Sequence, residues 1–189
     1  MLVVVPAIQL LNYLLGAWRQ GVLIAQVAWL YNDLGGGDEP FVREIFLAVV
    51  FGLFNNGSLA VAIGPGYSGL SRQGLAWAMI LGGVILTTMQ VQDLKDQAGD
   101  KLRGRKSICL HVGEEFSRIS IAVFVCLWSC VSGYSWGVSL LALSLIAIVA
   151  AVVMARVVLV RSPTADAKTW RLWCFWLSLL YALPVFGAL

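Results

Sequence analysis

The stretch VSLLALSLIAIVAAVVMARVVLV at residues 138–160 decides the fold class of this chain. It carries a single charge, Arg156, and it exceeds the roughly 20 helical residues that cross the hydrocarbon core of a bilayer. Backbone polar groups inside a bilayer must be paired within the protein itself, so an apolar run of this length predicts a transmembrane helix.

The composition of the whole chain agrees with a membrane protein. Hydrophobic residues make up 60% of the 189 residues and charged residues only 12%, against roughly 25% charged in a soluble domain. Further apolar runs predict spans at 42–63, 74–92, 117–134 and 170–188. The four cysteines show no spacing typical of a disulfide framework or a metal site.

The first thirty residues contain two shorter apolar runs, 2–16 and 22–31, separated by a short polar break around Arg19. We interpret them as two short spans joined by a tight turn. One long helix is the alternative, but it would place Arg19 inside the membrane at a high cost in free energy. The sequence therefore predicts an all-α integral membrane protein with about seven transmembrane helices in a single domain, 1–189.

Charge is distributed unequally between the two ends of these expected spans. Of the 13 Lys and Arg residues, only Arg19 and Arg72 lie at one end. The others fall in 31–44, 93–118 and 156–171, together with all 10 acidic residues. Loops rich in Lys and Arg face the cytoplasm, so we expect a multi-pass protein whose charged loops are cytoplasmic. The net charge of +3 is too small to indicate a nucleic-acid partner.

One acidic segment follows the span 74–92, with Asp93, Asp96 and Asp100 spaced i, i+3, i+7. In a continuous α-helix this spacing places all three carboxylates on one face. Their mutual repulsion is relieved when a cation lies between them, and Mg²⁺ commonly takes one or two carboxylates together with phosphate oxygens. We therefore predict that Asp93, Asp96 and Asp100 are metal ligands and catalytic residues.

A basic loop comes directly after the aspartates. Its residues Lys101, Arg105 and Lys106 are suited to the oxygens of a diphosphate. A solvated charged connector without a ligand is the alternative interpretation of the whole segment. Three polar residues near or within spans, Asn55, Asn56 and Gln92, are candidate pocket residues, and packing between helices is the alternative for them.

The pattern Asp93-x-x-Asp96-x-x-Gly99-Asp100-x-x-x-Gly104-Arg105-Lys106-Ser107 resembles the second aspartate-rich motif of the UbiA superfamily of intramembrane prenyltransferases. The segment 29–36, WLYNDLGG, is similar to members related to the UbiA-type terpene cyclases. The resemblance implies a bundle of nine helices, of which this chain corresponds to helices three to nine. The first motif of the family, Asn-Asp-x-x-Asp, belongs to a helix that we expect to be missing, and Asn32-Asp33 does not replace it because Gly36 stands where the next aspartate should be.

What the resemblance implies about activity is Mg²⁺-dependent ionisation of an isoprenyl diphosphate, with farnesyl and geranylgeranyl diphosphate as the expected substrates. Transfer of the prenyl group to a small hydrophobic acceptor is the first expectation. Cyclisation of the same cation by a terpene cyclase of secondary metabolism is the alternative. The third possibility is a truncated, non-catalytic membrane protein. Because the first aspartate-rich motif is expected to be missing, we expect little turnover from these 189 residues alone.

Overall fold

The computed structural model describes residues 3–187, which form nine α-helices and no strand. The chain divides into two compact units, Met1–Leu86 and Thr87–Leu189, and each is described by itself. The all-α class expected from the sequence is confirmed.

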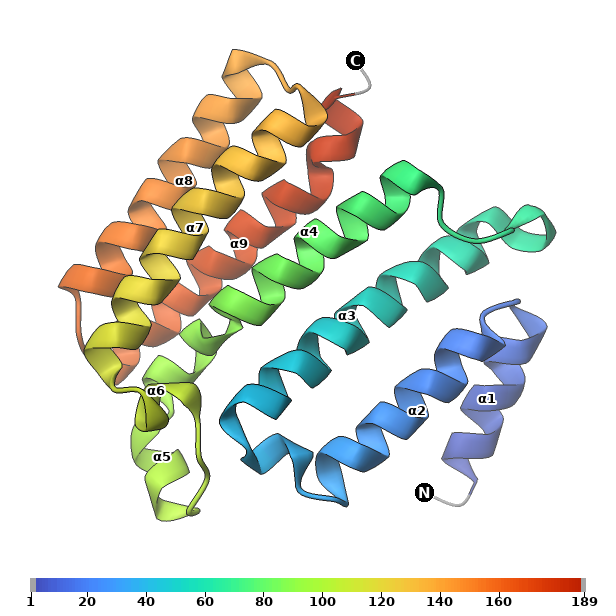
Figure 1. The fold of residues 1–189 in the computed structure, drawn as a ribbon, viewed down its shortest axis with the longest axis horizontal. Helices are drawn as coiled ribbons and strands as arrows, with labels where there is room; N and C mark the ends of the chain where they lie inside the picture. The colour runs from blue at the N-terminus through green and yellow to red at the C-terminus, as the bar shows by residue number, and fades with distance from the viewer. Residues whose placement is uncertain (1–2, 188–189) are drawn as a thin grey trace. The chain divides into compact units, whose positions relative to one another are not determined.

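The first unit begins with two short helices, α1 (Val4–Leu14) and α2 (Trp18–Asn32), which pack against each other (Figure 1). Gly16, with a φ of 79°, turns the chain between them in a conformation that few residues other than glycine adopt easily. The interpretation of two helices and a tight turn is therefore confirmed against one long helix. Residue 2 of the expected span 2–16 lies outside the described residues.

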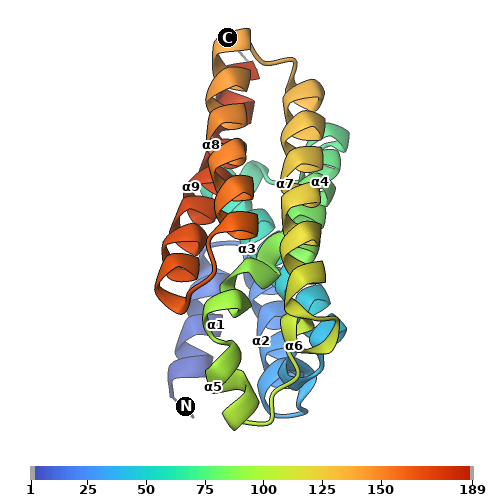
Figure 2. The same cartoon turned by 90° about the vertical axis from the view of Figure 1, so that its left-hand side faces the viewer.

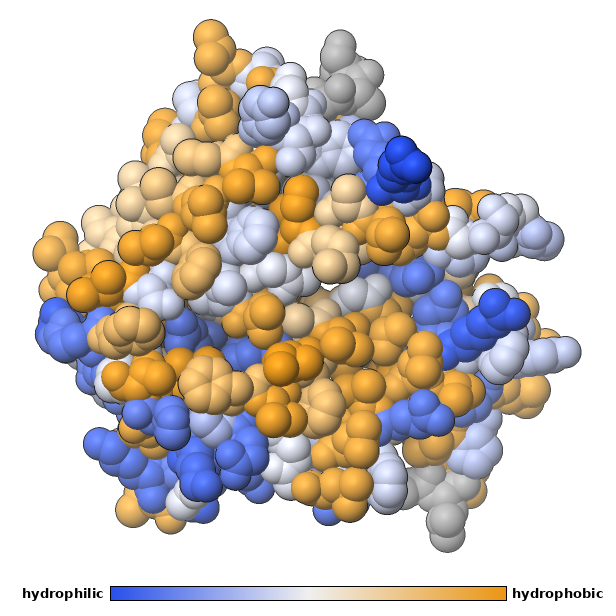
Figure 3. Space-filling model, viewed as in Figure 1, coloured by the Kyte–Doolittle hydropathy of each residue, from blue (hydrophilic) through white to orange (hydrophobic). Residues whose placement is uncertain are grey.

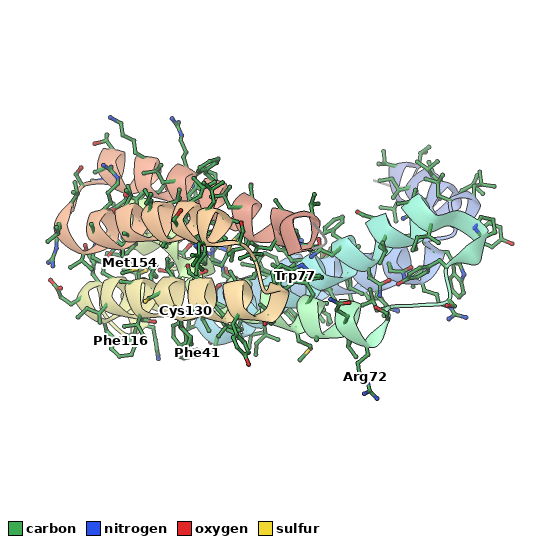
Figure 4. All side chains as sticks on the ribbon, turned by 90° about the horizontal axis from the view of Figure 1, so that it is seen from above. Phe41, Arg72, Trp77, Phe116, Cys130 and Met154 are labelled. Atoms are coloured by element: carbon green, nitrogen blue, oxygen red, sulfur yellow. The ribbon has the colours of Figure 1, made fainter. Side chains whose placement is uncertain are left out.

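The third helix of this unit, α3 (Pro40–Ile63), packs along α2. Proline at its first position suits a helix start, because the first N–H groups of a helix have no intrahelical partner. The helix α4 (Arg72–Thr88) follows, and Arg72 extends away from its first turn (Figure 4). Both helices match the spans expected at 42–63 and 74–92.

The second unit is built on three long helices, α7 (Glu114–Trp136), α8 (Leu140–Leu159) and α9 (Pro163–Gly187). They lie side by side, as Figures 1 and 2 show from two directions. Ser139 starts α8 by accepting a hydrogen bond from the backbone N–H of Ala142. These helices match the spans expected at 117–134, 138–160 and 170–188, although residue 188 lies outside the described residues.

Within the described residues, four helical segments are long and apolar enough to cross a membrane. They are Pro40–Gly66, Arg72–Lys95, Glu114–Trp136 and Leu140–Leu159. The other expected spans form helices too, but α1 and α2 are short and α9 is less apolar and contains Pro184. On the face drawn in Figure 3, much of the surface over the long helices is hydrophobic, whereas hydrophilic surface gathers around α5 (Gln97–Leu102) and α6 (Ile108–His111).

Candidate functional site

The acidic segment begins where α4 ends. The chain passes from α4 into a 3-10 helix, Met89–Lys95, and then into the short helix α5. Asp96 lies between these two elements, and its backbone is not helical, with a φ of −104° and a ψ of 3°. The carboxylate face expected from the sequence assumes one continuous α-helix from Asp93 to Asp100, and the chain instead changes helix type within this segment.

The three aspartates differ in their surroundings. Asp93 and Asp100 are buried, with exposed fractions of 3% and 4%. The Asp96 side chain is 55% exposed and is paired with Lys95. Among residues 3–187, no three His, Cys, Asp or Glu side chains are grouped so that they could hold a metal ion. A cage made by three carboxylates alone is therefore not assembled, and the role of each aspartate as a metal ligand stays a prediction.

Asp100 nevertheless has the features of a cation ligand. Its Oδ1 lies 3.8 Å from a guanidinium nitrogen of Arg105, while its Oδ2 is buried without a hydrogen-bond partner. A buried carboxylate oxygen without a partner is costly in free energy, and a bound cation would remove that cost. Since Mg²⁺ commonly uses one or two carboxylates and completes its shell with water and phosphate oxygens, Asp100 fits such an ion, with the buried Asp93 as a second candidate ligand.

The basic loop is folded back onto Asp100. Gly104 has a φ of 67°, and the N–H of Arg105 donates to the Asp100 carbonyl oxygen at 3.0 Å. This turn holds the Arg105 guanidinium beside the Asp100 carboxylate. Lys101 and Lys106 are exposed. The structure thus brings Asp100 and Arg105 together and leaves the two lysines at the surface near them in the chain.

A cleft of about 920 Å³ with several charged residues in its lining lies at the same end of the second unit. Lys101 lines it, whereas none of the three aspartates does. Most of its other charges are already paired: Arg118 with Asp166 and Glu114, and Arg161 with Glu115. The cleft is therefore a neighbouring feature and not the acidic site itself.

The candidate pocket residues have different roles in the structure. The Asn56 side-chain oxygen accepts hydrogen bonds from Gln20 Nε2 at 3.1 Å and from the Tyr67 hydroxyl, which fits the alternative of packing between helices. Asn55 and Gln92 are partly buried. A pocket role for Asn55 and Gln92 stays a prediction.

Two tryptophans that sequence reasoning left unassigned hold the end of α4 in place, and a third joins α9 to α7. Trp173 Nε1 donates to Thr88 Oγ1 at 3.0 Å, and Trp128 Nε1 donates to Thr87 Oγ1 at 2.9 Å. Trp176 Nε1 donates to Ser129 Oγ at 3.0 Å. The Trp173 and Trp128 bonds join the end of α4 to α9 and α7, so they position the 3-10 segment that carries Asp93. The threonine pair at the end of an apolar run is the sequence signal that could have revealed this role.

Comparison with known proteins places the chain in a family. The model of the UbiA prenyltransferase family matches residues 1–180. Over 100 residues the chain is 30% identical to the fumagillin beta-trans-bergamotene synthase of Aspergillus fumigatus, a match that covers 53% of this chain and 34% of that protein. The match thus spans about a third of the length of this curated relative. No solved structure matches. The chain belongs to the UbiA prenyltransferase family.

Proposed function

We propose that this protein ionises an isoprenyl diphosphate within the membrane, with the acidic segment and the basic loop holding the diphosphate. The observation that carries the proposal is the buried Asp100 carboxylate, whose Oδ2 lacks a partner and whose Oδ1 lies near Arg105. An arrangement of a carboxylate without a full set of partners beside a guanidinium suits a metal-bound diphosphate better than a simple connecting loop does.

The proposed chemistry divides between the basic and the apolar residues of the chain. Arg105, Lys106 and Lys101 would bind the diphosphate oxygens and so stabilise the charge of the leaving group. Mg²⁺ bound by Asp100 and Asp93 would withdraw further negative charge from the diphosphate. The carbon–oxygen bond breaks, its electron pair leaves with the diphosphate, and an allylic cation remains among the apolar helices.

Two fates of the cation are proposed, and each has a separate support. The family description, a prenyltransferase family, favours transfer to a small hydrophobic acceptor. The similarity to a bergamotene synthase favours the second fate, in which the cation closes on its own double bonds and loses a proton to give a cyclic hydrocarbon. Both fates share the ionisation step and its site.

Product analysis tests the proposal. The purified chain in lipid nanodiscs is supplied with Mg²⁺ and with farnesyl or geranylgeranyl diphosphate, with and without small hydrophobic acceptors. Diphosphate release with a hydrocarbon product in the absence of an acceptor identifies a cyclase, whereas a prenylated acceptor identifies a transferase. Mg²⁺-dependent binding without release identifies the non-catalytic alternative. The absence of both binding and release contradicts the proposed site.

A further inference from the structure

The first unit contains a cavity of about 660 Å³ between α1, α2 and α3. This volume lies within the range of sites that bind small organic ligands. Its walls are mainly aliphatic, and none of the described residues that line it is charged. A diphosphate or another ion would lose its hydration there without gaining an opposite charge, so the lining favours a neutral, largely apolar ligand.

One polar atom in the wall of this cavity lacks a partner. Gln9 Nε2 donates to the Gly21 carbonyl oxygen at 3.0 Å, and this bond fixes the orientation of the amide. Gln9 Oε1 is then left buried with no hydrogen-bond partner. A buried carbonyl oxygen without a donor costs free energy. A bound molecule that donates a hydrogen bond to this atom would remove that cost.

A second amide lies one helical turn away on the same face of α1. Asn12 also lines the cavity, and a Cβ added at Gly21 would clash with Asn12 Nδ2 and would lie 3.0 Å from Gln9 Oε1. The absence of a side chain at Gly21 therefore leaves room for both amides at one corner of the cavity. That corner offers an acceptor, Gln9 Oε1, beside a donor, Asn12 Nδ2.

We propose that this cavity binds a neutral amphiphile with a single hydroxyl head and an apolar chain, such as a long-chain prenyl alcohol. A hydroxyl group can donate to Gln9 Oε1 and accept from Asn12 Nδ2 at the same time, whereas an ether or a ketone only accepts. The apolar chain of the ligand then lies along the aliphatic walls and makes van der Waals contacts with them, while the paired hydroxyl head distinguishes this site from the surrounding lipid. This site is separate in the chain from the proposed diphosphate site and does not depend on its activity.

Binding of a defined probe tests the inference. Tritiated farnesol is bound to the full chain in nanodiscs with EDTA present, and unlabelled farnesol, farnesyl methyl ether and farnesyl diphosphate compete with it. We expect farnesol to compete best and the methyl ether about fivefold to tenfold less well, since the ether lacks the donated hydrogen bond. Farnesyl diphosphate should compete worst, because the lining is uncharged.

Variants of the cavity corner add a second, independent measurement. Gly21→Ala places a methyl group against both amides and should weaken farnesol binding at least fivefold. The matched control is Gly52→Ala on α3, where an added Cβ meets nothing within 4 Å, and it should bind like the wild type. Equal competition by farnesol and its methyl ether, together with normal binding by Gly21→Ala, would overturn the proposal and leave a non-specific apolar groove. Because EDTA removes divalent cations, failure of the diphosphate chemistry does not affect this result.

Discussion

Arg118 and Asp166 form a buried, two-point ion pair that joins α7 to the first turns of α9. Arg118 donates to the two carboxylate oxygens of Asp166 at 2.9 and 2.8 Å, and to the Val157 carbonyl oxygen at 2.8 Å. The exposed fractions of Arg118 and Asp166 are only 1% and 2%. Both residues belong to segments that the charge distribution assigns to cytoplasmic loops, yet they close the charged end of the helix bundle.

Breaking this pair from one side should strongly destabilise the second unit. We expect Arg118→Met to leave the buried Asp166 carboxylate without its main partner and to lower the free energy of unfolding by about 3–5 kcal/mol. Thermal unfolding in detergent measures the change. Arg161→Met is the matched control, because Arg161 pairs with Glu115 at an exposed position, and it should cost no more than about 1 kcal/mol. Equal stability of the two variants would contradict the role of the buried pair.

Much of the fold could be predicted from the sequence because lipid imposes a simple length rule. The apolar runs at 42–63 and 138–160 became α3 and α8, since a helix pairs the backbone groups of such a run within the run itself. The chain turns at Gly16, and Arg19 lies in the first turn of α2, at the end of that helix, where its charge avoids the cost of the membrane interior.

The geometry of the acidic site could not be predicted in the same way. The positions of Asp93, Asp96 and Asp100 depend on whether the helix continues beyond Thr88, and the sequence periodicity is the same in either case. The chain leaves the α-helix at Met89, and Asp93 and Asp100 are buried whereas the Asp96 side chain is 55% exposed. Neither the burial of Asp100 nor the turn that brings Arg105 to it is visible in the residue spacing.

The orientation of the chain is testable with cysteine labelling. Leu102 is a suitable site for the probe, because this residue is 90% exposed and lies in the charged segment between α4 and α7. In a chain without its native cysteines, we expect Leu102→Cys to react with an impermeant thiol reagent only after the membrane is opened, because positively charged loops face the cytoplasm. Ser68→Cys, in the exposed loop between α3 and α4, is the control and should react in sealed cells. The reverse pattern would contradict the expected topology.

A double-mutant cycle measures the contribution of the hydrogen bond between Trp173 and Thr88 at the end of α4. Trp173→Phe removes the N–H that donates to Thr88, while most of the buried ring remains. We expect a loss of about 1 kcal/mol in unfolding free energy, and a coupling of similar size when it is combined with Thr88→Val. Trp29→Phe, at a site 55% exposed on α2, should change stability by much less. Additive effects of the Trp173 and Thr88 changes would show that the hydrogen bond contributes nothing.

The aspartates themselves provide the sharpest test of the proposed diphosphate site. Asp93→Ala and Asp100→Ala should each weaken Mg²⁺-dependent binding of a prenyl diphosphate by about 1.5–3 kcal/mol, which is tenfold or more in affinity. Asp96→Ala should have a smaller effect, because the Asp96 carboxylate is half exposed and already paired with Lys95. Equilibrium binding of labelled farnesyl diphosphate, with and without Mg²⁺, measures the affinities.

The control for this series is Glu115→Ala, which removes an acidic residue from the same end of the second unit but leaves the aspartates intact. It should bind like the wild type in the presence of Mg²⁺. Asp100→Asn refines the result, since the amide keeps the size of the side chain and removes its charge. If Asp100→Asn behaves like Asp100→Ala, the charge of the buried carboxylate accounts for the binding. Wild-type affinity in Asp93→Ala and Asp100→Ala would show that the segment is a solvated connector, and the proposed diphosphate site would have to be abandoned.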